Sequence, residues 1–179
     1  MIVTKIQEYG NLLAIIYDNG ARQLAYPMST GLWIVKDVTA PGLGGDFIYP
    51  FSPSVISSRF RTAERPTHDG LDFSYGGIGG AAIKCAGDGV VDNISDDPYT
   101  TTFGNFAAVN HGTIGGVNVR TIYAHMATPP LVEIGDTVVK GQNLGPVGTT
   151  GLSTGNHLHW QVELDGDPVD PEIFMADYV

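Results

Sequence analysis

The sequence contains little positive charge. It has nine lysines and arginines against nineteen aspartates and glutamates, which gives a formal net charge of −10 at pH 7. Proteins bind nucleic acids mainly through basic side chains, and an acidic chain repels such polyanions. We therefore expect no nucleic-acid partner.

Cysteine and long hydrophobic runs are also scarce. The single cysteine, Cys85, excludes an internal disulfide and a zinc site built from several thiolates. No stretch approaches the ~20 apolar residues of a membrane-spanning helix, so no membrane span is expected. The apolar run at 12–16 lies between Glu8 and Asp18 and lacks the basic start and small-residue cleavage site of a secretory signal peptide. We expect that no signal peptide is present.

Glycine, in contrast, is abundant. It accounts for 24 of the 179 residues, about twice the usual ~7%. Together with 11 prolines and few helical patterns, this content indicates tight turns between short strands. The only helix expected is one short turn within 171–178. The strand-like segments are 81–85, 89–94, 106–110, 117–124, 137–139 and 157–164.

The N-terminal region has the pattern of a β-hairpin. Residues 12–17 and 21–26 are strand-like. Asp18-Asn19-Gly20 lies between them and favours a tight turn, because Asn and Gly tolerate positive φ. A further apolar patch follows at 32–35.

A glycine-rich stretch separates this region from the rest of the chain. Pro41-Gly42-Leu43-Gly44-Gly45 has the composition of a linker. We place the boundary there. The prediction is an N-terminal hairpin region with its linker over 1–45 and a main domain over 46–179.

Two short segments carry residues suited to metal binding. In His157-Leu158-His159 two imidazoles lie on the same side of a strand, because alternate residues share a face. His68 precedes Asp72 by four residues, and Gly70 between them leaves space. Alone, either segment could be a solvent-facing strand or a surface loop. From their three histidines and Asp72, the two segments can supply two histidines and a carboxylate, the ligand set of a catalytic zinc site with an open fourth position.

The order of three motifs resembles a known family. His68-Asp69-Gly70-Leu71-Asp72, Tyr123-Ala124-His125-Met126 and His157-Leu158-His159 are similar to the signature motifs of the lysostaphin-type (LytM-like, M23) zinc endopeptidases of bacterial cell walls. The glycine-rich stretch 148–155 also matches, and the resemblance extends from about 47 to 174. It implies a mainly β fold, with an antiparallel β-sheet core of the M23 peptidase type and an N-terminal β-hairpin appendage.

The resemblance also implies a division of roles among the site residues. His68, Asp72 and His159 would hold one Zn²⁺ ion. His125 and His157 would be catalytic and flank a metal-activated water, one as general base and the other stabilising the oxyanion. Which histidine has which role stays open. After His159 the family commonly has an aromatic residue and then Glu, whereas this chain has Gln161.

Three further residues are candidates for the substrate groove. They are Asn105, His111 and Tyr123. Each has a simpler alternative. Asn105 could be a turn residue, His111 could be structural, and Tyr123 could pack in the core.

The function implied is zinc-dependent hydrolysis of peptide bonds in bacterial peptidoglycan, with its peptide crosslinks as the partner. The alternative is a non-catalytic M23-like wall-binding or structural component of a phage particle. Because no signal peptide is expected, we predict delivery by a phage, as an endolysin in the host cytoplasm before lysis or as a lytic protein of the virion. Residues 1–45 could then dock to a phage tail or to the wall.

Two other folds share part of the pattern. His157, His159 and Glu163 partly fit the first motif of a cupin barrel, but only 16 residues follow Glu163, and His68 and Asp72 stay unexplained. Gly135-Asp136 and Gly141-Gln142 resemble the turn of a biotinyl or lipoyl carrier, yet the lysine that carries the cofactor is absent there.

Overall fold

The computed structural model describes residues 47–99, 102–114 and 117–176, together with the backbone of four N-terminal strands. Those strands form an antiparallel sheet in the order β1-β2-β3-β4. The predicted hairpin corresponds to β2 and β3, which pair antiparallel, and the patch at 32–35 contributes the start of β4. The appendage is thus larger than one hairpin. Its strands are β1 (Val3–Tyr9), β2 (Leu12–Tyr17), β3 (Arg22–Pro27) and β4 (Trp33–Val38).

The predicted turn at 18–20 and the linker at 41–45 lie outside the described residues. The domain boundary at 45 therefore stays a prediction. From residue 47 onward the backbone and side chains are described, apart from the short gaps given above.

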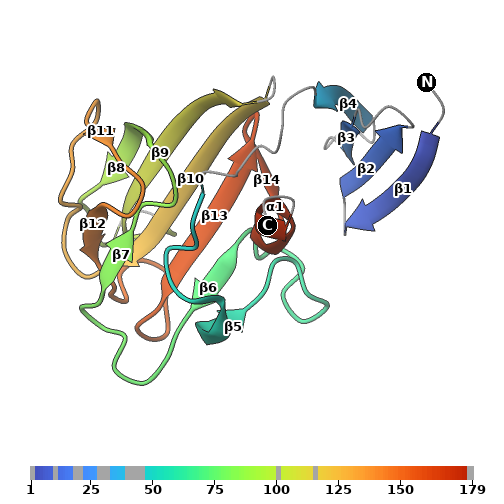
Figure 1. Ribbon diagram of the computed structural model, residues 1–179. Helices are drawn as coiled ribbons and strands as arrows, with labels where there is room; N and C mark the ends of the chain where they lie inside the picture. The colour runs from blue at the N-terminus through green and yellow to red at the C-terminus, as the bar shows by residue number, and fades with distance from the viewer. Residues whose placement is uncertain are drawn as a thin grey trace.

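The main domain is built on one large antiparallel sheet (Figure 1). Its strand order is β11-β8-β9-β10-β13-β6-β5, and β14 pairs with β13. A separate two-stranded sheet joins β7 to β12, and a short helix, α1, follows β14. The elements are η1 (Pro53–Val55), β5 (Ile56–Ser58), β6 (Leu71–Phe73), β7 (Ala82–Lys84), β8 (Gly89–Ser95), β9 (Asn105–Ile114), β10 (Val117–Met126), β11 (Thr137–Val138), β12 (Asn143–Pro146), β13 (Leu158–Leu164), β14 (Asp167–Val169) and α1 (Pro171–Ala176).

This arrangement confirms the mainly β, antiparallel fold. Each predicted strand of the main domain is present, within a few residues of the expected ends. The sequence did not reveal β5, β6, β12 and β14. Each has only three or four residues, too few to show a clear alternation. Among the described residues, no helix has the length and apolar character needed to cross a membrane.

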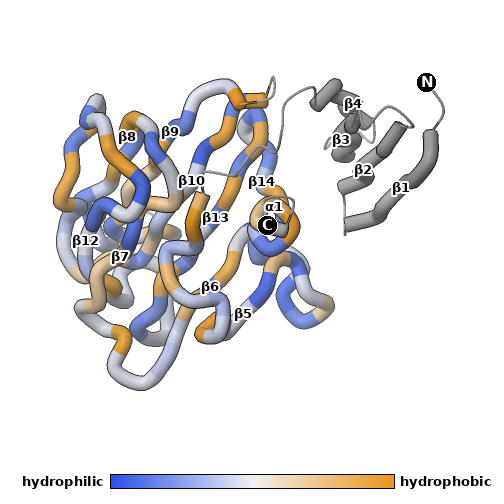
Figure 2. The backbone as a smooth tube through the Cα atoms, viewed as in Figure 1, coloured by the Kyte–Doolittle hydropathy of each residue, from blue (hydrophilic) through white to orange (hydrophobic). Residues whose placement is uncertain are grey.

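The central strands have two chemically different faces. On β13, Leu158, Trp160 and Val162 belong to the main hydrophobic core, whereas the residues between them point to the other side. Figure 2 shows the resulting alternation of hydropathy along the strands. The core face also carries the fully buried Tyr123 of β10 and Phe73 of β6. The opposite face of the sheet, which we call the site face, is free to carry polar side chains.

Candidate metal centre and catalytic cleft

Strand pairing brings two candidate ligands together. Asp72 of β6 and His159 of β13 are Cα partners in the antiparallel register, and each lies between residues of the core face. Both side chains therefore emerge on the site face. His159 Nδ1 is 3.0 Å from Asp72 Oδ1.

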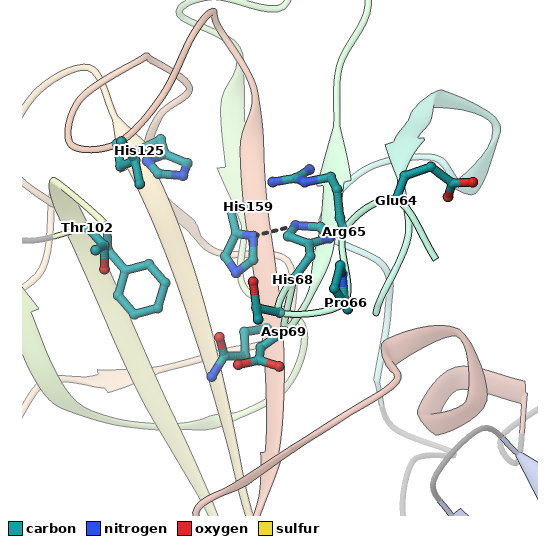
Figure 3. A pocket seen from close by; sticks show the side chains of 12 residues that line it. Glu64, Arg65, Pro66, His68, Asp69, Thr102, His125 and His159 are labelled. Carbon is teal, nitrogen blue, oxygen red and sulfur yellow. Dashed lines mark hydrogen bonds between the residues drawn. The ribbon is translucent and has the colours of Figure 1, made fainter. Parts of the chain in front are cut away.

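The third candidate comes from the loop before β6. His68 Nε2 is 2.9 Å from Asp72 Oδ1 and 3.1 Å from His159 Nδ1. One donor atom from each of the three residues lies within 4.8 Å of the others, and all three side chains are buried. Figure 3 shows His68 and His159 facing one another across this space. The structure thus brings together the three residues that the sequence predicted as ligands.

The donor set fits a zinc ion chemically. His68 Nδ1 is 2.8 Å from the backbone carbonyl oxygen of Arg59, which can only accept, so Nδ1 carries the proton. The lone pair of His68 Nε2 then points into the cluster, as in metal-binding histidines held by an outer carbonyl. Burial alone would raise the pKa of Asp72, but the contacts of its carboxylate with His159, His68 and Arg65 outweigh that effect and hold the pKa well below its usual value. Two imidazole nitrogens and an ionised carboxylate suit Zn²⁺.

A glycine makes room for this cluster. A Cβ atom at Gly70 would lie 2.8 Å from His159 Cε1 and 2.4 Å from the carbonyl oxygen of Trp160. Both are closer than a carbon side chain tolerates. Gly70 therefore leaves space beside the ligands, as predicted.

A β-bulge turns His125 onto the site face. The register between β9 and β10 shifts between Tyr123 and Met126, and His125 has a positive φ of 63°. Without the shift, His125 would share the core face with Tyr123, two residues earlier. His125 Nδ1 is 2.8 Å from the carbonyl oxygen of Thr150, which leaves Nε2 unprotonated. Burial and, next, the neighbouring His157 lower the pKa of His125 to about 4.

His157 stands beside His125. The two ring centroids are 4.6 Å apart, and His157 Nε2 is 3.8 Å from Asp72 Oδ1. His157 Nδ1 is 2.8 Å from the carbonyl oxygen of Gly155, so its Nε2 is also the nitrogen that can accept a proton. Two further imidazoles thus lie next to the ligand cluster.

The cluster lies where two cavities adjoin. One has a volume of about 560 Å³ and the other about 640 Å³. His125, His159, Arg65 and Leu152 line both, so the two cavities form one cleft. A peptide lying along the cleft would pass the histidines at its middle.

The structure corrects the predicted substrate groove. Tyr123 is fully buried in the main core, where its hydroxyl accepts a hydrogen bond from the Ala86 amide. Asn105 is 2% exposed and donates to the carbonyl oxygen of Met126. His111 is 2.8 Å from Thr121 Oγ1, which is buried near Tyr123.

The reason for this error is the strand alternation. Asn105 and His111 are separated from the core residues Ala107 and Val109 of β9 by even numbers of residues, so their side chains point to the core face. The site face of the same strand carries Phe106 and Ala108 instead. Tyr123 and His125 are two residues apart and would share a face of a regular strand, but the bulge places them on opposite faces.

Sequence reasoning missed three residues of the cleft. Arg65 Nη1 donates to Asp72 Oδ2 at 2.6 Å. The ring of Phe103 stacks on that of His159, with centroids 5.7 Å apart, and its carbonyl oxygen accepts from the His125 amide. Leu152 is 81% exposed at the junction of the cavities. For these residues the sequence held one indication of a place in the cleft: Arg65 lies three residues before His68.

Gln161 lies in the first cavity and donates to Glu163 Oε1 at 2.8 Å. Glu163 in turn pairs with Arg120, which also binds Asp92. Gln161 is thus the end of a charged row that extends along the site face of β13, β10 and β8.

Comparison with known proteins agrees with this geometry. The chain is 33% identical over 134 residues to the DD-carboxypeptidase/endopeptidase Mpg of Neisseria meningitidis serogroup B, a match that covers 72% of this chain and 29% of that protein. The chain spans less than a third of that relative's length.

Two solved structures are also similar. A zinc-containing peptidase from Vibrio cholerae has a TM-score of 0.59 and 29% identity, covering 89% of this chain and 48% of that one. The catalytic domain of lysostaphin from Staphylococcus simulans has a TM-score of 0.52 and 28% identity, covering 74% of this chain and 89% of that domain. The sequence profile described as peptidase family M23 matches residues 66–171, which hold all the candidate ligands and both flanking histidines. The chain therefore belongs to peptidase family M23.

Proposed function

We propose that the protein is a zinc-dependent endopeptidase that hydrolyses peptide bonds in bacterial peptidoglycan. The observation that carries the proposal is the His68, Asp72 and His159 cluster, with donor atoms within 4.8 Å, beside two further histidines. Membership of family M23 supports it, as do relatives named for DD-endopeptidase activity and for a zinc-containing peptidase.

The residues divide the chemistry between them. His68, Asp72 and His159 would hold the ion, which supplies a Lewis acid and lowers the pKa of a water toward neutrality. His125 and His157 each hold Nδ1 against a carbonyl oxygen, so that Nε2 is the nitrogen that takes up a proton when the ring is neutral. The same imidazoles, once protonated, can stabilise the negative charge that develops on the carbonyl oxygen. The lowered pKa of His125 keeps it neutral near pH 7 and therefore able to act as a base.

Peptidoglycan digestion tests the proposal directly. The full chain would be incubated with purified wall from several bacteria, with and without added zinc, and the released fragments identified by mass spectrometry. New peptide ends that appear with zinc and disappear with a chelator are the expected result. Release of sugar fragments alone, or no stoichiometric zinc uptake, would refute it.

A non-catalytic role in wall binding or in a phage particle is less well supported. The three ligand candidates and the two flanking histidines are all present and all turned to one cleft. Delivery by a phage, the docking role of residues 1–45 and the boundary at 45 stay predictions. Mass spectrometry of purified virions would test the first of these.

A further inference from the structure

We propose that Arg65 binds a free carboxylate of the substrate beside the scissile bond. The inference rests on the proposed function and narrows its substrate class, because some wall peptides carry a carboxylate near their crosslink and others do not. Arg65 lines both cavities of the cleft, at the point where they meet. A group bound there would lie next to the bond that the histidines attack.

The guanidinium of Arg65 is fixed by one of its three nitrogens. Nη1 donates to Asp72 Oδ2 at 2.6 Å and to Ser58 Oγ at 2.8 Å. Neither Nε nor Nη2 has a hydrogen-bond partner among the residues that the structure describes. The side chain is 51% exposed and lines the cleft. Its anchored geometry lowers the entropy lost when a ligand binds.

Arg65 supplies the positive charge in a cleft whose described lining also carries the carboxylates of Glu64, Asp69 and Asp72. Arg65 is the only lysine or arginine among the described residues that line the two cavities. Asp69, on the wall of the first cavity, already pairs with Arg61 at 2.7 Å. Figure 3 shows the Arg65 guanidinium reaching over His68 toward the side of His125, whereas the Glu64 carboxylate points the other way.

A carboxylate is the anion that matches these donors. A guanidinium offers parallel N–H groups that bind both oxygens of one carboxylate, which a point charge cannot do. The net charge of −10 gives the protein no general attraction for anions, so the recognition must be local. A substrate with an amide or a plain glycine at that position would leave these donors without an anion.

The test compares two synthetic crosslinked wall peptides that differ only in one carboxylate next to the scissile bond, free in one and amidated in the other. Turnover would be measured with wild type, Arg65→Gln, Arg65→Lys and, as a matched control, Arg59→Gln. The Arg59 side chain pairs with Glu172 and lines neither cavity. Zinc content would be measured for every variant, because Arg65 also contacts Asp72.

We expect wild type and Arg59→Gln to prefer the free carboxylate by roughly tenfold or more in kcat/KM, as for a charged hydrogen bond. Arg65→Gln should cleave both peptides equally, and Arg65→Lys should keep part of the preference. Equal cleavage by wild type, or an Arg65→Gln variant that is slower on both peptides by the same factor, would overturn the inference and leave the proposed function standing.

A binding measurement makes the test independent of turnover. Calorimetry with metal-free protein and the same two peptides should show the preference in wild type and its loss in Arg65→Gln. If wild type cleaves neither peptide, the proposed function fails, and the calorimetric preference alone then supports or overturns the role of Arg65.

Discussion

The imidazole of His159 packs against the backbone at Gly70. A methyl group at residue 70 would lie 2.8 Å from His159 Cε1 and 2.9 Å from Nε2. Because residue 70 has no side chain, the segment next to His159 leaves space for its ring in the orientation that faces His68 and Asp72.

Gly70→Ala should damage both the fold and the metal centre. The added methyl must displace His159 or the Trp160 carbonyl, and such overpacking typically costs about 1–3 kcal/mol of stability. Urea unfolding and zinc titration would measure the two effects. Gly76→Ala is the matched control, because nothing lies within 4 Å of its added methyl. Equal behaviour of the two variants would show that Gly70 has no packing role.

Asp72→Asn should abolish stoichiometric zinc binding. The amide removes the negative charge and leaves His68 and His159 as the remaining pair of candidate ligands. We expect the zinc affinity to fall by more than the ~10–100-fold that is typical when a residue hydrogen-bonded to a metal ligand is removed. Competition with a zinc-sensitive chelating dye would measure it. Asp69→Asn, whose carboxylate pairs with Arg61, should bind zinc like wild type, and the ligand assignment fails if the two variants respond alike.

His125→Asn should retain zinc and lose turnover. Asparagine tolerates the positive φ of this position, so the bulge can persist. Loss of a proton-transferring imidazole lowers rates by about 10²–10⁴-fold. Turnover and zinc content would be measured on the same sample. His111→Asn is the matched control. The ring of His111 contacts Thr121 on the core face, so the turnover of this variant should stay close to that of wild type. A fully active His125→Asn variant would exclude His125 from catalysis.

The metal-free protein should lose stability in mild acid because of His125. Its pKa is about 4 in the folded state and about 6.5 in an unfolded chain, so the unfolded state takes up the proton first as the pH falls. The stability is complete above about pH 6.5 and is lost progressively toward pH 4. Between about pH 7.5 and 5 the loss assigned to His125 is about 2 kcal/mol. Denaturant unfolding of wild type and His125→Asn at both pH values would measure this loss. If both proteins lose the same stability between the two pH values, the loss does not come from His125.

Tyr123→Phe should reduce stability and spare catalysis. The hydroxyl is the partner of the Ala86 amide in the core, and leaving that N–H unpaired costs about 1–3 kcal/mol. Thermal unfolding and turnover would be compared with those of Tyr99→Phe, whose side chain is 92% exposed and should be neutral. A selective loss of turnover would restore Tyr123 to the substrate groove.

The clustering of His68, Asp72 and His159 could be expected from the sequence because each part of it is local. The spacing of His68 and Asp72 and the alternation of His157 and His159 depend only on a few neighbouring residues. Strand register then brings the two segments together, as β6 pairs with β13. The face of His125 could not be predicted, since it depends on one bulge that breaks the two-residue period.

The paths of the irregular segments could not be predicted from the sequence either. Arg65 and Phe103 lie on segments without regular structure, and their contacts with Asp72 and His159 depend on how those segments fold back. The error at Tyr123 has the same origin, because a strand residue near His125 could lie on either face until the register is known.

Asp72 and His159 are 87 residues apart in the chain, although they meet across β6 and β13. An unfolded chain can offer a metal ion only local pairs, His68 with Asp72 or His157 with His159, so the complete ligand set is a property of the native state. An ion that binds the native state alone adds about 1.4 kcal/mol of stability for each tenfold excess over its Kd. Metal occupancy and pairing of these two strands are then one linked equilibrium, and the melting temperature in graded free zinc would report the affinity of the centre without any substrate.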